Sequence, residues 1–224
     1  MGNHDPRLES IRKIARQTAA ADPAHDFSHC LRVLANALQI SRQEGGDVEI
    51  LEAASFLHDI ANLPKSHPDS RLSSERSASA AEKILADNGF SVGQIEKAKD
   101  AILCHSYSRG LTPRTLEGRI FQDADRLDSL GAIGIARTFT VGGATNRPIY
   151  DLEDPFFASG RASREYDDKS NTLDHFFVKL FKLGETMQTD TGRKLAHERI
   201  ERMKLFVENL RAEITAEVTR EITP

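Results

Sequence analysis

The sequence lacks the long apolar runs that would place the chain in a membrane. Its 224 residues contain no uninterrupted stretch of about 18 apolar residues. The opening residues, MGNHDPRLES, contain no apolar core of a signal peptide. The chain has only two cysteines, Cys30 and Cys104, and they do not form a CxxC pair. We therefore expect a cytoplasmic protein that does not associate with membranes, with both thiols reduced and buried.

The sequence also lacks the excess of positive charge that a general nucleic-acid binder needs. Thirty Lys and Arg residues stand against 34 Asp and Glu residues, which gives a net charge of -4. No segment resembles a DNA-binding motif, and the aromatic residues are too scattered to stack successive bases. We expect a small-molecule partner and no nucleic acid, and a homo-oligomer is left open.

Strands and repeats are absent from the pattern as well. No segment alternates apolar and polar residues as a half-buried strand does, whereas helical spacing recurs along the whole chain. Helices are expected at about residues 8–20, 27–44, 47–58, 73–88, 91–105, 116–139, 173–183 and 193–217. The pattern predicts an all-α fold and one domain over residues 1–224, with its core at about 20–210 and a long loop or lid near 142–171.

The most informative stretch is ILEAASFLHD, which ends on His58 and Asp59. Leu51, Ala54 and His58 recur at i, i+3 and i+7, so the imidazole continues the buried stripe of its helix. A carboxylate at the inner end of an apolar helix is costly unless something compensates, and a divalent cation compensates well. The alternative is a core histidine with a capping acid.

A second histidine and a third helix complete a candidate metal site. His29 stands in the first turn of the preceding helix, and antiparallel packing across a short connection would bring it beside His58. Asp125 of the segment DADRLD would add a second carboxylate, whereas Asp123 points nearly the opposite way on its helix. Two imidazoles and two carboxylates suit octahedral Mn²⁺, Fe²⁺, Co²⁺ or Ni²⁺, and Zn²⁺ fits less well.

The order His29, His58-Asp59, Asp125 resembles the H…HD…D signature of the HD-domain metal-dependent phosphohydrolases. The flanking blocks AHDFSHCLRV, FLHDIANLPKSHP, ILCHSYS, FQDADRLDSLGAIGIARTF and LDHFFVKLFKLGETMQT are similar to its bacterial YedJ/YpgQ-like branch, over nearly all of residues 20–210. This resemblance implies a single HD-domain helical bundle that holds one divalent metal through the four signature residues. Mn²⁺ is preferred as the metal, with Fe²⁺, Co²⁺, Ni²⁺ or Mg²⁺ as alternatives.

The resemblance also implies hydrolysis of phosphate esters or anhydrides, usually of nucleotides. For this branch we expect a (d)NTP pyrophosphohydrolase that yields NMP and PPi with a metal-activated water. A nucleoside monophosphate phosphatase and a non-catalytic metal- or nucleotide-binding module are the alternatives. Some relatives carry an acid-base glutamate three residues after the metal aspartate. Asn62 stands at that position here, so the resemblance does not supply the general acid or base.

Further residues are assigned to catalysis and to phosphate binding. His58, Asp59, His105 and Asp128 are the catalytic candidates, and Asp128 would either support the metal site or orient water. Positive charge must balance the charge that develops on phosphoryl oxygens. The substrate-binding candidates are Lys65, Ser108, Arg109, Arg126, Lys179 and Lys182. Arg109 and Lys182 could equally be solvated surface residues, and Arg126 could be a structural brace.

Overall fold

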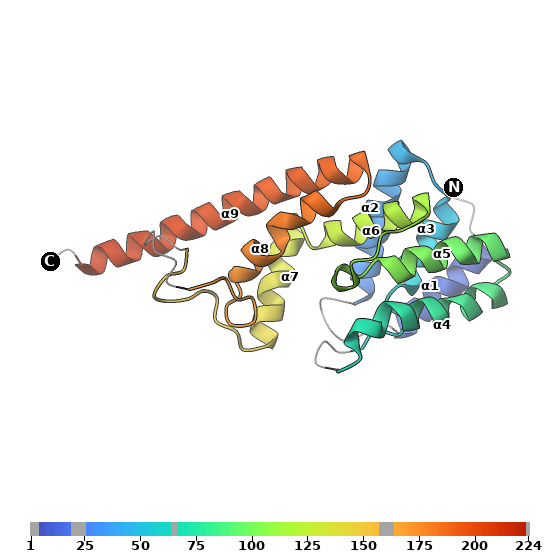
Figure 1. The fold of residues 1–224 in the computed structure, drawn as a ribbon, viewed down its shortest axis with the longest axis horizontal. Helices are drawn as coiled ribbons and strands as arrows, with labels where there is room; N and C mark the ends of the chain where they lie inside the picture. The colour runs from blue at the N-terminus through green and yellow to red at the C-terminus, as the bar shows by residue number, and fades with distance from the viewer. Residues whose placement is uncertain (1–4, 19–25, 64–66, 157–163, 223–224) are drawn as a thin grey trace. The chain divides into compact units, whose positions relative to one another are not determined.

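The structure, a computed structural model, describes residues 5–18, 26–63, 67–156 and 164–222 (Figure 1). The α-helices are α1 (Pro6–Thr18), α2 (Phe27–Glu44), α3 (Val48–Leu57), α4 (Ser73–Asp87), α5 (Val92–Cys104), α6 (Leu116–Asp128), α7 (Gly131–Ala144), α8 (Asp174–Val178) and α9 (Asp190–Ile222). Short 3₁₀ helices are η1 (Ser70–Leu72), η2 (Tyr107–Arg109) and η3 (Leu180–Thr186). No strand occurs among the described residues, so the predicted all-α fold is confirmed.

The chain divides into two compact units. The first unit consists of Met1–Asp128 together with Met187–Arg193, and the second of Ser129–Thr186 together with Lys194–Pro224. The first unit contains α1 to α6, and therefore all four residues of the candidate metal site. A single domain over residues 1–224 stays a prediction.

Helix α3 is the centre of the first unit, because it packs against α1, α2, α4, α5 and α6. Residues 53 to 57 are all buried. A helix that is apolar on every side can bury its side chains away from water only when other helices surround it. The sequence ILEAASFL therefore places its last residue and His58 deep inside the unit, and Asp59 follows with its side chain partly exposed.

Polar side chains fix where several of these helices begin. The side chain of Asp47 accepts a hydrogen bond from Glu49 N and caps α3, and Ser91 forms a capping box with Gln94 at the start of α5. Neither Ser73 nor Ser74 caps α4. Helix η1 runs directly into α4 and Leu72 occupies the cap position, while the Ser73 hydroxyl accepts a hydrogen bond from Leu63 N.

The single helix predicted over 116–139 is two helices in the structure. Helix α6 ends at Asp128 and α7 begins at Gly131, which has a φ of 70°. An L side chain rarely adopts this left-handed conformation, and a Cβ at Gly131 would also lie 3.2 Å from the Arg199 side chain. The left-handed glycine therefore separates α6 from α7 and prevents one continuous helix.

The second unit is built around a cluster of phenylalanines. Phe139 of α7, Phe176 of α8 and Phe206 of α9 have ring centroids 5.8 to 6.1 Å apart. The described residues between α7 and α8 contain no helix, as expected for the loop near 142–171. The end of this loop is held to its beginning, since Thr172 N donates to Pro148 O and Leu173 N to Ile149 O. Its role as a lid stays a prediction.

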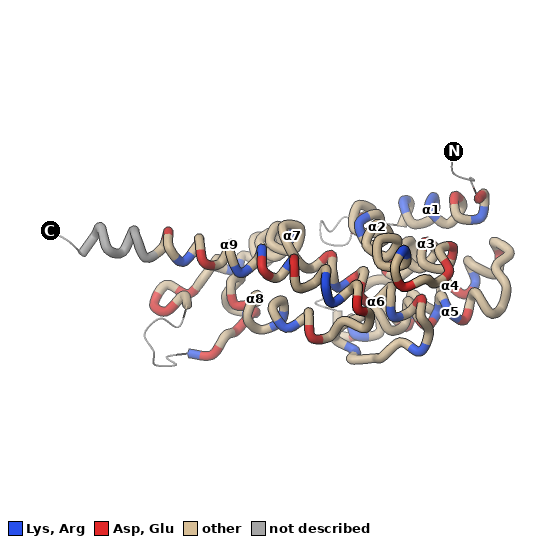
Figure 2. The backbone as a smooth tube through the Cα atoms, turned by 90° about the horizontal axis from the view of Figure 1, so that it is seen from above, with Lys and Arg blue, Asp and Glu red and all other residues tan. Residues whose placement is uncertain are grey.

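The charged residues do not gather by sign along the backbone. Figure 2 shows Lys and Arg interleaved with Asp and Glu along the described part of α9 and along α4 and α5. Among the described residues, none of the helices combines the length and the apolar character needed to cross a membrane.

Candidate metal centre

Two imidazoles face each other where α2 begins and α3 ends. Asp26 caps α2 and accepts a hydrogen bond from His29 N at 2.9 Å, which fixes His29 in the first turn. His58 is the residue that ends α3. Their Nε2 atoms lie 3.1 Å apart, and both side chains are almost fully buried. The structure thus brings the two histidines together as antiparallel packing of the two helices requires.

Two carboxylates approach the same pair of nitrogens. Asp125 Oδ1 on α6 lies 3.4 Å from His29 Nε2, and Asp59 Oδ2 lies 3.4 Å from His58 Nε2 and 4.0 Å from His29 Nε2. His29, His58 and Asp125 each offer a ligand atom within 4.8 Å of the others, which is a spacing that could hold a metal ion. Asp59 extends this set on the side of His58.

The hydrogen bonds of the outer ring nitrogens determine what the inner ones can do. His58 Nδ1 lies 3.0 Å from Ser55 O, and His29 Nδ1 lies 2.7 Å from Asp128 Oδ2. A carbonyl and a carboxylate only accept, so both Nδ1 atoms must donate. In the neutral rings both Nε2 atoms then carry lone pairs, which repel each other at 3.1 Å. A proton or a cation between them removes the repulsion, and the two adjacent carboxylates favour the higher charge of a metal ion.

The spacing of the four side chains fits octahedral coordination. Ligand atoms about 2.1 Å from one ion lie about 3.0 Å apart when adjacent and about 4.2 Å apart when opposite. The four measured separations, from 3.1 to 4.0 Å, fall within this range. Burial opposes ionisation of Asp125, but the nearby imidazoles of His29, His105 and His58 outweigh it and lower its pKa. An ionised Asp125 is the form that can ligate a cation.

Asp128 supports His29 and has a partner that the sequence analysis missed. Its Oδ2 accepts from His29 Nδ1, while Arg32 Nε donates to Oδ1 at 2.7 Å and Arg32 Nη2 donates to Oδ2 at 3.1 Å. Arg32 Nη1 also donates to Ser28 Oγ, which donates to the cap residue Asp26. Asp128 therefore resembles a carboxylate that orients a metal-binding histidine, not one left free to orient water. The sequence shows only that Arg32 lies three residues after His29 on the same helix face, which does not identify Asp128 as its partner.

Asp123 takes part in a different set of contacts, as its position on α6 suggested. It is fully buried, and it accepts hydrogen bonds from Gln188 N, Thr189 N and Thr189 Oγ1. Burial raises its pKa. Its contacts hold the segment before α9 within the first unit.

His105 lies at the edge of the cluster. It ends α5, its Nδ1 donates to Ile102 O at 2.6 Å, and its Nε2 lies 3.8 Å from Asp59 Oδ1. Burial lowers its pKa, against the opposing effect of the Asp125 and Asp59 carboxylates. The ring is therefore neutral near pH 7 and presents a lone pair on Nε2. That state suits a proton acceptor, which agrees with the catalytic role expected from the sequence.

The expected phosphate-binding residues lie in different surroundings. Arg126 is buried beside Asp125, and its guanidinium lies over the Tyr107 ring at 5.7 Å. Arg109 Nη1 donates to Glu75 Oε2 at 3.1 Å, and the exposed Ser108 lies 3.1 Å from Ser106 Oγ. Lys65 lies outside the described residues. Lys179 and Lys182 both belong to the second unit, Lys182 as an exposed residue of η3.

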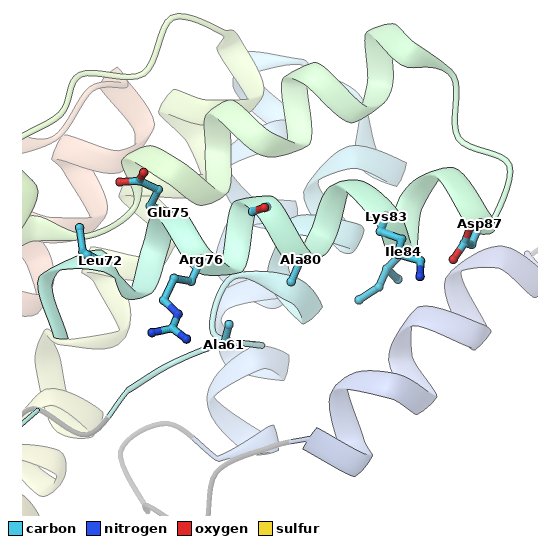
Figure 3. Close-up of a pocket in the computed structure, with 9 residues that line it drawn as sticks. Ala61, Leu72, Glu75, Arg76, Ala80, Lys83, Ile84 and Asp87 are labelled. Carbon is cyan, nitrogen blue, oxygen red and sulfur yellow. The ribbon is translucent and has the colours of Figure 1, made fainter. Parts of the chain in front are cut away.

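A separate groove of about 840 Å³ runs along α4 (Figure 3). Its lining residues are Ala61, Leu72, Glu75, Arg76, Ser79, Ala80, Lys83, Ile84 and Asp87. Figure 3 shows Glu75 and Arg76 near one end of the helix and Lys83 and Asp87 near the other. The groove has charges of both signs and contains none of the candidate metal ligands, so it is not part of the metal centre.

Comparison with known proteins places this geometry in a family. Residues 26–130 match the model of the HD domain, a range that contains all four candidate ligands. The protein YpgQ of Bacillus subtilis strain 168 is 35% identical over 195 residues, which cover 85% of this chain and 84% of YpgQ. The chain belongs to the HD-domain family, in its YpgQ-like branch.

Several solved structures share the fold of this chain. The crystal structure of B. subtilis YpgQ in complex with ADP has a TM-score of 0.71 and 32% identity, and covers 92% of this chain and 97% of that chain. An HD-superfamily hydrolase from Bacillus thuringiensis has a TM-score of 0.70 and 32% identity, covering 94% and 95% of the two chains. A Lactobacillus plantarum protein has a TM-score of 0.72 and 30% identity, covering 96% and 100%.

Proposed function

We propose that this HD-domain protein is a metal-dependent phosphohydrolase that converts nucleoside triphosphates to the monophosphate and pyrophosphate. The pair of buried Nε2 atoms 3.1 Å apart, flanked by two carboxylates, carries the proposal, because it is a donor set that a divalent cation completes. The ADP complex of YpgQ supports a nucleotide as the substrate.

In this proposal His29, His58, Asp59 and Asp125 hold one divalent metal, with Mn²⁺ favoured by the mixed nitrogen and oxygen set. The metal supplies Lewis acidity, which makes water a better nucleophile near neutral pH and polarises a phosphoryl oxygen. The supporting hydrogen bonds belong to the protein. Asp128 and the Ser55 carbonyl accept hydrogen bonds from the Nδ1–H groups of His29 and His58, so both Nε2 atoms point inward as ligands.

His105 is proposed as the residue that receives a proton from the attacking water. Its lowered pKa leaves it neutral, and its Nδ1–H bond to Ile102 O fixes the ring with Nε2 facing Asp59. Arg126, which follows Asp125 directly, is proposed to balance charge on the phosphoryl oxygens. Ser108, Arg109, Lys65, Lys179 and Lys182 stay proposals for binding the outer phosphates. Arg109 would have to leave or share Glu75 for this role.

A nucleotide panel with Mn²⁺ tests the proposal when pyrophosphate and orthophosphate are quantified separately. We expect triphosphates to release pyrophosphate, and Asp125→Asn to abolish that release. Glu96→Gln is the matched control, because it also converts an acid to an amide, at an exposed position on α5. Orthophosphate release from monophosphates alone would support a nucleotidase. Stoichiometric metal without turnover on any nucleotide or simple phosphate ester would indicate a binding module.

A further inference from the structure

A short loop links the metal centre to the surface of the first unit. Residues 105–110, here called the 105–110 loop, follow α5 and begin with His105, whose Nε2 lies 3.8 Å from Asp59 Oδ1. Two residues later the loop carries Tyr107, which is 39% exposed. Two residues of chain span at most about 7 Å. The loop therefore connects the proposed reaction centre to an exposed aromatic ring over a short distance.

One buried side chain holds both ends of the 105–110 loop. Gln122 of α6 is fully buried, and its Nε2 donates to Cys104 O at 2.5 Å and to Leu111 O at 2.9 Å. These two carbonyls belong to the residues just before and just after the loop. Gly110 adopts the left-handed conformation that closes η2, with a φ of 63°. The loop is thus fixed to the helix that carries Asp125, and Tyr107 has a defined position before any ligand binds.

Tyr107 differs from the other aromatic residues in exposure and in its neighbour. It is the most exposed Phe or Tyr among the described residues. Arg126 lies over its ring at 5.7 Å and follows Asp125 in the chain. Arg126 and Tyr107 therefore lie side by side. The guanidinium suits a phosphate, and the aromatic ring suits a base. In a nucleotide, phosphate and base are separated by a single sugar, and the same order occurs here from the metal centre outward.

We propose that Tyr107 is the residue against which the base of the nucleotide stacks. This inference rests on the proposed nucleotide substrate and adds the contact that distinguishes a nucleotide from a base-free phosphate compound. Aromatic stacking accepts any base, because every base has a π face. Tyr107 therefore favours nucleotides over inorganic polyphosphates and discriminates weakly among bases.

The test compares ADP with pyrophosphate, which has the same phosphoanhydride without sugar and base. Calorimetric titrations use the Mn²⁺-loaded full chain with Tyr107, Tyr107→Phe and Tyr107→Leu. We expect Tyr107→Leu to raise the Kd for ADP roughly 5- to 150-fold, the range of aromatic stacking contacts, with the Kd for pyrophosphate unchanged. Tyr107→Phe keeps the ring and should restore ADP binding. An equal loss for both ligands, or no loss for ADP, would overturn the inference.

A second measurement needs no destabilising variant. The sequence has no tryptophan and only three tyrosines, so emission excited within the tyrosine absorption band comes from tyrosine alone. ADP should quench part of this emission, pyrophosphate should not, and the quenched part should be missing in Tyr107→Phe. Quenching that persists in Tyr107→Phe would refute the contact. Failure of the proposed function would be seen in a different assay, as absence of nucleotide turnover with Mn²⁺. A protein that bound pyrophosphate but no ADP would contradict both the proposed function and the Tyr107 contact.

Discussion

Replacing Asp128 by asparagine should weaken metal binding although Asp128 is not a proposed ligand. The side chain is buried, and it accepts from His29 Nδ1 at 2.7 Å and from two nitrogens of Arg32. An asparagine side chain has one acceptor oxygen, so at least one of these bonds is lost and the His29 ring loses its anionic partner. Loss of the residue that orients a metal-binding histidine typically costs about 10- to 100-fold in metal affinity or activity.

The same substitution should also destabilise the fold. Hydrogen bonds to charged groups contribute about 1.5–3 kcal/mol each, and Arg32 would be left without its bidentate partner. Because the Arg32 side chain is 29% exposed, water offsets part of the loss, and we expect the free energy of unfolding to fall by about 1–3 kcal/mol. Metal-free protein shows this loss in denaturant titrations, separately from any effect on metal.

Calorimetry with Mn²⁺ measures the affinity, and two further variants sharpen the result. Arg32→Gln should also lower the affinity for Mn²⁺. The double variant, with both Asp128→Asn and Arg32→Gln, should lose less binding free energy than the two single variants added together, because both residues act through one contact. Asp100→Asn is the matched control. Asp100 is also a buried acid paired with an arginine, Arg114, but it caps the start of α6 through Thr115 and contacts none of the proposed ligands. If Asp128→Asn destabilised the fold while Mn²⁺ bound normally, the orienting role would be refuted.

Three further predictions concern the metal centre and its neighbours. Asp125→Asn should no longer bind stoichiometric Mn²⁺, while its helical circular dichroism persists. The control Glu96→Gln should keep the metal. An Asp125→Asn protein that is unfolded would contradict the reasoning. His105→Gln should lower kcat by roughly 10²- to 10⁴-fold, as expected for loss of a general base, with one metal still bound; unaltered kcat would remove that role. Burial raises the pKa of Cys30 to about 12 from 9.0, so above pH 9 the unfolded chain loses a proton that the folded protein keeps. The free energy of unfolding should therefore fall as the pH rises from 9 to 12, and Cys30→Ala should show a shallower fall; equal slopes would contradict the assignment.

The helices and the two histidines could be predicted because their signals are local. Helical periodicity and the Gly45-Gly46 break define α2, whose predicted bounds agree with the structure. His29 and His58 are separated by one short connection, so antiparallel packing alone brings them together. Placing Asp125 beside the two histidines required knowing that a third helix contacts theirs. The family resemblance implied this contact, and helical periodicity cannot show it.

The supporting contacts could not be predicted because they depend on side-chain direction across long separations. Arg32 and Asp128 are 96 residues apart in the chain, and each could equally face solvent on an amphipathic helix. The break before Gly131 depends on a left-handed backbone, which the sequence GAIGIA does not distinguish from a tolerated helical glycine. Gln122 offered no signal, since a buried carboxamide on a helix has no characteristic spacing.

Anomalous diffraction from crystals grown with Mn²⁺ tests the central claim most directly. We predict one Mn²⁺ ion per chain at coordination distance from His29 Nε2, His58 Nε2 and carboxylate oxygens of Asp59 and Asp125. An anomalous peak elsewhere, or none between the two imidazoles while they remain 3.1 Å apart, would show that a shared proton and not a metal ion joins them.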